Sequence, residues 1–346
     1  MKTALITGGA GFIAHHLIAR ILTQTDWNIV TLDRLDYSGN LNRLNDILQY
    51  ECTPNERKRV RVVWHDLKAE LNPLVRREIG KVDYILHLAA GSHVDRSIDY
   101  PMEFVMDNVV GTCNILEFAK SLDNLERFLY FSTDEVFGPA KPGQSFLEWD
   151  RYNSTNPYSA AKAGGEELAI AFENTYELPI AITHCMNVYG ERQHPEKYIP
   201  NTLWKLKNNK KITIHASKDK STPGSRHYLY SEDVASSVMF ITENFEQLKT
   251  TQFPKNEVGP KCLKVNIPGT KELDNLEVAR LISQYSGFNL DYELVDFHSS
   301  RPGHDLRYAI DGTFITDAGW GPKYTVEDSL EKLVRWYLEN PEWLEF

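Results

Sequence analysis

The chain has 346 residues, of which 42% are hydrophobic and 25% charged, and its formal net charge is −10. This length is typical of one large domain or two unequal lobes in an ordinary globular protein. The negative charge disfavours nucleic acid and anionic membrane surfaces as main partners.

The cysteines lie far apart, so their spacing indicates neither a zinc site nor a dense disulfide framework. They are Cys52, Cys113, Cys185 and Cys262. The first residues lead directly into a strand pattern without the layout of a signal peptide. No apolar run approaches the roughly 18 residues of a membrane span. We therefore expect a reduced, cytoplasmic protein without a metal site, a membrane span or a nucleic-acid partner.

Short apolar runs alternate with longer amphipathic stretches through the first half of the chain. The expected strands cover residues 4–7, 28–32, 60–64, 83–89, 127–132 and 179–185, and a long helix is expected over residues 155–176. This alternation predicts an α/β fold, with a Rossmann-type, doubly wound parallel sheet that carries helices on both faces.

The regular alternation of strands and helices ends after Asn187. Helix-like pieces over residues 199–209 and 231–244 are separated by loops rich in Pro and Gly and by a few short strands. We expect residues 1–187 to form the Rossmann domain. Residues 188–346 are expected to form mainly a smaller, mixed α/β C-terminal lobe that binds the substrate, with some segments returning to the sheet.

A glycine motif follows the first strand, where Gly8, Gly11 and Ala14 have the spacing Gly-x-x-Gly-x-x-Ala. Gly8 permits a tight turn, Gly11 lets the backbone approach a pyrophosphate, and Ala14 lets the helix pack closely on the strand. The pyrophosphate of a dinucleotide would sit on the free amides of the helix N-terminus, at Phe12 and Ile13.

The second strand ends at Asp33, which is followed by Arg34. An acid at this position can bind both ribose hydroxyls of NAD and repels the 2′-phosphate of NADP. A neighbouring arginine can instead accommodate that phosphate. We favour NAD as the cofactor.

The ends of the third and fourth strands extend the expected cofactor site. Asp66, followed by Leu67, is placed to meet the adenine amino group. Leu88, Ala89 and Ala90 leave room for the cofactor, although simple strand packing explains these three residues equally well.

A candidate base opens the long helix. Tyr158 and Lys162 are four residues apart, so they share one face of the helix. A nearby ammonium favours a phenolate, and we therefore expect Lys162 to lower the pKa of Tyr158 from about 10. Tyr158 would then act as a base near neutral pH. Such a pair is common by chance, but here it follows a dinucleotide motif.

Asp134 and Glu135 follow Thr133 at the end of the fifth strand. Two adjacent carboxyls there would usually form a solvated turn or a helix cap. In open α/β sheets, however, ligands bind beyond the carboxyl ends of the strands. Two carboxyls in different environments can divide acid and base roles. A plain dehydrogenase needs only the tyrosine and lysine, so the extra pair indicates a second reaction, such as loss of water.

The chain resembles the dTDP-glucose 4,6-dehydratase family, of the extended short-chain dehydrogenase/reductase class, and its UDP-glucose 4,6-dehydratase relatives. The resemblance covers nearly the whole chain, in GGAGFIA, LDRLDYSGNL, HLAAGSHVDRSI, STDEVFG, NPYSAAKAG, MNVYGERQHPEKYIP, RHYLYSEDV and SRPGHDLRYAID. The triplet at 133–135 is the most specific of these stretches. GDP-mannose dehydratases typically read Thr-Ser-Glu there, and UDP-glucuronate decarboxylases lack the Asp-Glu pair.

The resemblance implies dehydration of a nucleoside-diphosphate-glucose to the 4-keto-6-deoxy sugar with bound NAD. Tyr158, helped by Lys162 and Thr133, would take the proton of the 4-hydroxyl as hydride leaves C4. Glu135 would remove the C5 proton while Asp134 protonates the departing 6-hydroxyl. The hydride would then return to C6.

Further residues are matched to ligand contacts by the resemblance. The matched substrate contacts are Ser92, Thr133, Asn187, Lys197, Arg226, Asn266, Arg301 and His304. Arg226 and Arg301 suit a diphosphate, although a single arginine is usually just a surface residue. Asn108 matches an asparagine near the active site, or serves only in helix packing. The family also implies a homodimer built on helices over about 101–120 and 155–176.

Four departures from the family pattern concern the nucleotide base and fine sugar specificity rather than the chemistry. They are Gly91, Phe137, Met186 with Val188 around Asn187, and His227-Tyr228 after Arg226. The base is therefore left open between dTDP and UDP.

Three other functions compete with this interpretation. A sugar-nucleotide epimerase or decarboxylase would share the fold, but Asp134 and Glu135 argue against both. An inactive, NAD-binding regulatory protein would need no catalytic residues, whereas the set of Thr133, Tyr158, Lys162 and the two carboxyls is complete.

Overall fold

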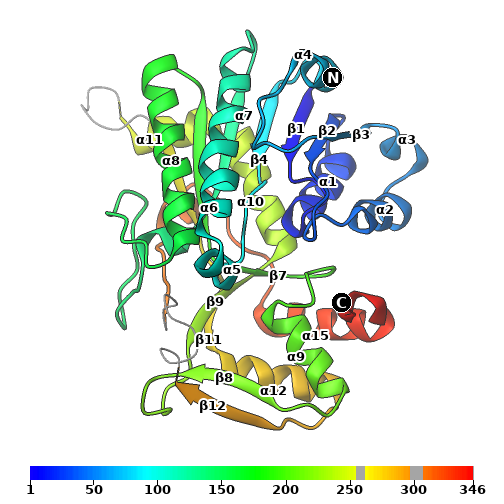
Figure 1. The fold of residues 1–346 in the computed structure, drawn as a ribbon, viewed down its shortest axis with the longest axis vertical. Coiled ribbons are helices and arrows are strands. Elements are labelled where there is room, and N and C mark those ends of the chain that lie inside the picture. Colours follow the sequence, from blue (N-terminus) through cyan, green and yellow to red (C-terminus); the bar gives the residue numbers. More distant parts are fainter. Residues whose placement is uncertain (255–261, 297–306, 346) are drawn as a thin grey trace.

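The computed structural model describes residues 1–254, 262–296 and 307–345 (Figure 1). Its largest element is a seven-stranded sheet with the order β10-β6-β5-β4-β1-β2-β3. Every neighbouring pair in this sheet is parallel. Its strands are β1 (Thr3–Thr7), β2 (Asn28–Asp33), β3 (Val60–Trp64), β4 (Tyr84–His87), β5 (Arg127–Thr133), β6 (Ile180–Cys185) and β10 (Leu263–Ile267). The doubly wound fold expected from the sequence is confirmed.

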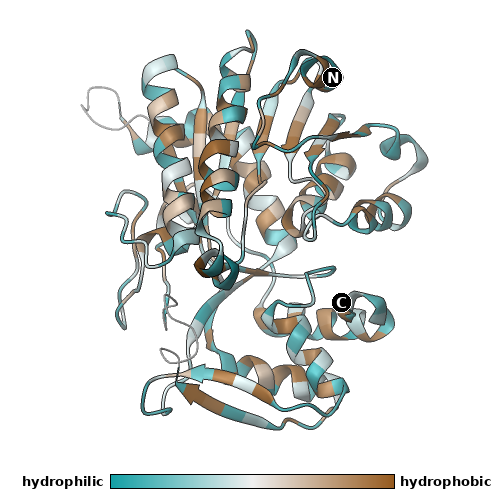
Figure 2. Ribbon diagram, viewed as in Figure 1, coloured by the Kyte–Doolittle hydropathy of each residue, from teal (hydrophilic) through white to brown (hydrophobic). Residues whose placement is uncertain are grey.

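Both faces of the sheet are covered by helices because its strands are apolar on both sides (Figure 2). Within β1, Ala4 and Ile6 belong to one core and Leu5 to the other. The first core includes residues from α1 (Phe12–Gln24), α2 (Leu41–Tyr50), α10 (Ser231–Glu243), α11 (Phe245–Gln252) and α14 (Thr313–Asp317). The second includes residues from α4 (Pro73–Ile79), α7 (Gly111–Lys120) and α8 (Pro157–Tyr176).

The chain between β4 and β5 is mostly helical. It contains α5 (Val94–Asp99), then α6 (Pro101–Val105), a π-helical segment η1 (Met106–Val110) and α7. These last three follow one another without a break beside α8, where Gly165 packs against η1. A Cβ added at Gly165 would lie 2.7 Å from the Asn108 carbonyl oxygen, so only glycine permits this approach. Short helices occur elsewhere as α3 (Pro54–Arg57) and the 3₁₀ segment η2 (Asp134–Phe137).

A smaller part of the structure lies below the sheet in Figure 1. It holds a three-stranded sheet of order β11-β9-β7 and a two-stranded sheet of β12 and β8. The strands are β7 (Asn187–Tyr189), β8 (Ile212–Ala216), β9 (Ser225–Tyr230), β11 (Lys271–Asp274) and β12 (Tyr292–Asp296). Its helices are α9 (Tyr198–Lys207), α12 (Asn275–Ser286), α15 (Val326–Glu339) and the 3₁₀ segment η3 (Pro341–Leu344).

Segments from the C-terminal half also join the large sheet. Strand β10 pairs with β6, and α10 packs on α1. The two parts of the molecule are therefore interleaved in sequence. Among the described residues, no helix is both long and apolar enough to cross a membrane.

Candidate active site

A cleft of about 760 Å³ lies where β1, β2, β4 and β5 end, between the large sheet and the smaller part of the structure. The strand order reverses between β1 and β4, and ligands in open α/β sheets bind at such a point. The cleft is lined by most residues that the sequence selected. They are Gly8, Gly11, Phe12, Ile13, Asp33, Arg34, Asp66, Leu67, Leu88, Ala89, Ala90, Ser92, Thr133, Asp134, Glu135, Tyr158, Lys162, Asn187, Lys197 and Arg226.

The turn from β1 into α1 suits a dinucleotide. Gly8 has a φ of 72°, and a Cβ there would lie 2.9 Å from the Ala89 Cα. The Gly11 amide donates to the Gly8 carbonyl at 2.8 Å, and α1 then begins at Phe12 without a side-chain cap. The amides of the first helical turn therefore face the cleft without a capping side chain, which suits a pyrophosphate.

Asp33 is buried at the end of β2 and held by two backbone amides. Its carboxylate accepts from the Ala10 amide at 3.0 Å and from the Leu35 amide at 2.8 Å. Arg34 is turned to other acids, because its guanidinium donates to Asp36 and Asp107. The fixed carboxylate of Asp33 thus suits a ribose diol, as NAD requires.

Tyr158 and Lys162 lie on the first turns of α8, which begins with an Asn156 capping box and Pro157. The Lys162 Nζ donates to the Phe131 carbonyl at 2.7 Å and lies 4.3 Å from the centre of the Tyr130 ring. Burial lowers the pKa of Lys162 to about 7.

The expectation that Lys162 lowers the pKa of Tyr158 is wrong for this structure. Burial and the charge of Glu135 raise that pKa, and a hydrogen bond with the Thr133 side chain acts in the opposite direction. The physical reason is that the ammonium is itself buried and turned to a backbone carbonyl. Thr133 is therefore the neighbour that assists the phenol in this structure.

The chain turns at the two carboxyls, where the 3₁₀ segment η2 directly follows β5. Strand β5 ends at Thr133 and η2 starts at Asp134, so both side chains of the pair line the cleft. Asp134 is buried and accepts from the Thr133 hydroxyl at 3.2 Å. Glu135 is partly exposed and accepts from the Asn156 side-chain amide at 3.3 Å.

The two carboxyls differ in their electrostatics. Burial, and then the charge of Glu135, raise the pKa of Asp134 to about 7, although the charge of Arg226 acts in the opposite direction. A protonated Asp134 at neutral pH can donate a proton, whereas a carboxylate at 135 can accept one. The pair is thus suited to divide acid and base roles.

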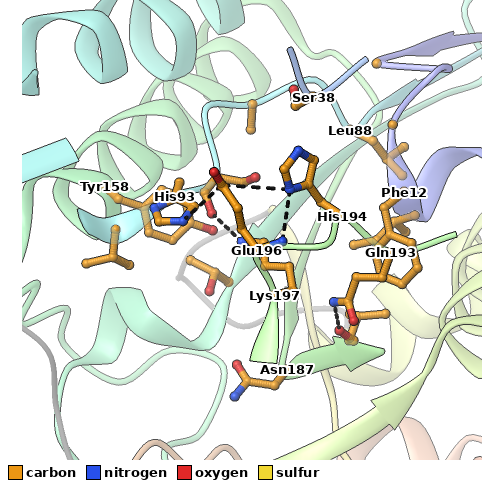
Figure 3. Close-up of a pocket in the computed structure, with 18 of the residues that line it drawn as sticks. Phe12, Ser38, Leu88, His93, Tyr158, Asn187, Gln193, His194, Glu196 and Lys197 are labelled. Carbon is orange, nitrogen blue, oxygen red and sulfur yellow. Dashed lines mark hydrogen bonds and ion pairs between the residues drawn. The ribbon is translucent and has the colours of Figure 1, made fainter. Parts of the chain in front are cut away.

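Lys197 and Asn187 approach the cleft from the smaller part of the structure (Figure 3). The Lys197 Nζ donates to the Ser92 carbonyl at 3.3 Å, and this contact joins the loop after β4 to the start of α9. Arg226 lies 4.8 Å from the centre of the Tyr308 ring and also lines the cleft. Two cations on this side of the cleft suit an anionic ligand.

Two residues that we expected to contact the substrate or the cofactor do not line the cleft. Asn266 is fully buried behind the site, where its side-chain amide donates to the Phe146 and Asp311 carbonyls, so it holds loops together. Asn108 is also buried, and it exchanges two hydrogen bonds with the Gly91 backbone, which supports the loop after β4. Arg301 and His304 lie outside the described residues.

Several lining residues were missed by the sequence interpretation. Asp107 and Asp36 are hydrogen-bonded to Arg34. Glu196 lies between His93 and His194 in the lining of the cleft (Figure 3). Arg43 is buried, and it donates to the carbonyls of Ala10, Ser38 and Arg192. A buried arginine in an amphipathic helix has no local sequence signal, because its partners are backbone atoms that only the fold assembles. Within the described ranges, no group of three or more His, Cys, Asp or Glu is placed to hold a metal.

The chain is similar in sequence and structure to known sugar-nucleotide dehydratases. The family model described as GDP-mannose 4,6 dehydratase matches residues 5–333. A dTDP-glucose 4,6-dehydratase of Neisseria gonorrhoeae is 36% identical, over 98% of this chain and 96% of that protein. The dTDP-glucose 4,6-dehydratase DesIV of Streptomyces venezuelae, solved with NAD bound, has a TM-score of 0.84 at 32% identity and covers 99% of both chains.

A longer plant protein is also similar. It is a trifunctional UDP-glucose 4,6-dehydratase, 3,5-epimerase and reductase of Arabidopsis thaliana, 38% identical over 99% of this chain. The chain spans about half of that protein, or 48% of its length.

The raised pKa of Asp134 predicts how the free energy of unfolding depends on pH. The native protein holds this proton to about pH 7, while the unfolded chain loses it near 3.8, so ionisation of Asp134 lowers stability as the pH rises between these values. Asp134→Asn should therefore raise the free energy of unfolding at pH 8, by about 1–4 kcal/mol. Urea unfolding should show this gain shrinking to about half or less at pH 5. A gain that stays constant from pH 5 to pH 8 would assign it to packing instead.

Proposed function

The chain belongs to the GDP-mannose 4,6-dehydratase family, and we propose that it dehydrates a nucleoside-diphosphate-glucose to the NDP-4-keto-6-deoxyglucose. The observation that carries this proposal is the turn at the end of β5, which brings Asp134 and Glu135 into one cleft with Tyr158. An epimerase needs the tyrosine, lysine and threonine, whereas elimination of water also needs an acid and a base. The similarity to dTDP-glucose and UDP-glucose dehydratases supports glucose as the sugar.

The cofactor site fits NAD. The uncapped start of α1 would hold the pyrophosphate, Asp33 the ribose hydroxyls, and Asp66 with Leu67 the adenine. When bound, NAD supplies an acceptor for hydride from sugar C4 and a donor of hydride to C6. Gly8, Ala89 and Ala90 keep this side of the cleft free of bulky side chains.

Tyr158 takes the proton of the sugar 4-hydroxyl in the proposed first step. Thr133 hydrogen-bonds to the phenol and assists the removal of its proton. Lys162 lies one helical turn away, and its hydrogen bond to the Phe131 carbonyl fixes it against β5. Its pKa of about 7 lets it exchange a proton near neutral pH.

Glu135 and Asp134 then act on C5 and C6. The 4-ketone makes the C5 hydrogen acidic, and Glu135 removes it as a carboxylate. Asp134 is protonated up to about pH 7, so it can deliver a proton to the departing 6-hydroxyl as water. Glu135 then exchanges its proton with solvent and delivers one to C5. Tyr158 still holds the proton of the 4-hydroxyl and Asp134 lacks the one that left with water, so exchange with solvent restores both groups for the next turnover.

We further propose a cytoplasmic homodimer. Helices α6, η1, α7 and α8 lie side by side on one face of the sheet (Figure 1). Exposed apolar side chains near these helices support an interface there, and they are Ile98, Tyr100, Met102, Val105 and Tyr176. The cysteines are all free, as in proteins of a reducing compartment.

Turnover of sugar nucleotides tests the proposed reaction directly. The purified protein with NAD should convert dTDP-glucose or UDP-glucose to a 4-keto sugar that absorbs in alkali, and should leave GDP-mannose largely unchanged. The side-by-side rates also identify the nucleotide base. A product that keeps its 6-hydroxyl would instead indicate an epimerase.

Isotope exchange in deuterated water tests the division of labour. The wild-type product should carry one solvent deuteron at C5 and none at C6. Tyr158→Phe should abolish both product and exchange into recovered substrate. Asp134→Asn should lower the rate of product formation about 100-fold or more while recovered substrate still gains deuterium at C5.

Glu135→Gln should prevent both C5 exchange and product formation. Glu167→Gln is a matched control, because it removes the same charge from the exposed side of α8. If C5 of the wild-type product carries no solvent deuteron, the dehydratase mechanism is wrong.

The dimer is tested by sedimentation velocity. The wild-type protein should sediment with twice the chain mass of 39.8 kDa. Met102→Glu should shift it toward the monomer, because a charge in an apolar interface is costly to bury. Leu74→Glu, an equally drastic change on the exposed surface of α4, should leave the dimer intact. A monomeric wild-type protein would contradict the proposal.

A further inference from the structure

We propose that Asp107 is a specificity-determining residue that makes the cofactor site select NAD against NADP, by keeping Arg34 occupied. This inference rests on the proposed function, because it concerns the cofactor of that same site. Arg34 directly follows Asp33 and lines the cleft. An arginine in this place is a natural partner for the 2′-phosphate of NADP. The structure shows that its guanidinium is already bound.

Three carboxylates surround the guanidinium of Arg34. Asp107 binds it in bidentate fashion, with Nη1 to Oδ1 at 2.5 Å and Nη2 to Oδ2 at 2.9 Å. Asp36 accepts from Nε at 2.7 Å, and the carboxylate of Asp66 lies 3.9 Å from Nη1. Paired, parallel hydrogen bonds of this kind combine charge with a fixed geometry. All the guanidinium nitrogens therefore have an acid as partner.

A local irregularity brings Asp107 to this position. It lies in the π-helical segment η1, where the Gly111 amide donates to the Met106 carbonyl five residues before it. The wider turn lets Asp107 reach Arg34 while the next residue, Asn108, bonds the Gly91 backbone. Gly91 leaves room for this, because a Cβ there would lie 3.2 Å from the Asp107 Oδ2. π-Helical turns of this kind are frequent at functional sites.

The charges around Arg34 oppose binding of the 2′-phosphate of NADP. Asp33, Asp36, Asp66 and Asp107 line this part of the cleft together with the cations Arg34, Arg43 and Lys68, so carboxylates outnumber cations. Arg43 is bound to the Ala10 and Ser38 carbonyls, and Lys68 is paired with Asp66. The Asp107 side chain is only 11% exposed. A 2′-phosphate could recruit Arg34 only by displacing Asp107, which would leave a poorly hydrated carboxylate without its partner. Asp107 thus disfavours NADP in two ways. Its charge repels the 2′-phosphate, and its hydrogen bonds keep Arg34 from binding that phosphate.

Equilibrium titration of NAD and NADP into the full-length protein tests the inference without turnover. The wild-type protein should bind NAD more tightly. Asp107→Asn removes the charge at nearly constant shape, and Asp107→Ser also makes room for a phosphate. Each should tighten NADP binding by about 10-fold or more, because Arg34 becomes available for charge-assisted hydrogen bonds. NAD binding should change by no more than about threefold.

Two further variants show whether the effect acts through Arg34. Arg34→Ala added to either Asp107 variant should remove the gain for NADP. Glu103→Gln, which removes the same charge from an exposed position on α6, should leave the NAD-to-NADP ratio unchanged. A purely structural role of Asp107 would weaken both dinucleotides and would not move this ratio.

The results separate the inference from the proposed function. If the wild-type protein prefers NAD and neither Asp107 variant improves NADP binding, Asp107 is not the determinant and the dehydratase proposal is unaffected. The inference is equally overturned if the wild-type protein already binds NADP as well as NAD. If it binds neither dinucleotide, the proposed function fails together with the inference.

Discussion

Parallel pairing of β1, β4 and β5 is the constraint on which the site depends. In a parallel sheet the carboxyl ends of all strands meet at one edge, so the segments that follow Thr7, His87 and Thr133 converge although they are distant in sequence. Gly8 approaches Ala89 closely, so the segments after β1 and β4 lie next to each other at the cofactor site. Helix α8 then packs across β5 and η1, and it presents Tyr158 to the same edge.

A buried polar network lies next to Lys162 and the end of β5. Glu166 lies one turn after Lys162 and is fully buried. It accepts from the hydroxyls of Ser132 and Tyr152 and contacts His184. Burial alone would raise the pKa of Glu166, but His184 and the other partners lower it, so this acid stays ionised in the core. Because Ser132 precedes Thr133, the network also fixes the end of β5.

Burial gives the two ends of the cleft different chemistry. At the end of β5, burial and then the charge of the adjacent Glu135 raise the pKa of Asp134, and the charge of Arg226 offsets them only in part. Near Asp33, the carboxylates of Asp36 and Asp107 are hydrogen-bonded to Arg34. Burial opposes ionisation of Asp36, but its hydrogen bonds with Ser38 and the charge of Arg34 lower its pKa. The pKa of an aspartate is thus raised at Asp134 and lowered at Asp36, and only Asp36 is in contact with a cation.

The sequence alone predicted the alternating strands, which the structure confirms. It also singled out the glycine turn, Asp33, and the set of Thr133, Asp134, Glu135, Tyr158 and Lys162, which the structure brings to one cleft. These features are local, because they depend on periodicity, on a turn or on residues a few positions apart. The tertiary structure decided where the chain turns after β5. It also decided that the Asn266 side chain hydrogen-bonds to loop carbonyls and that Lys162 hydrogen-bonds to a backbone oxygen. It alone joined Asp107 to Arg34, 73 residues apart. Such contacts depend on how strands and helices pack, and no spacing within one segment encodes them.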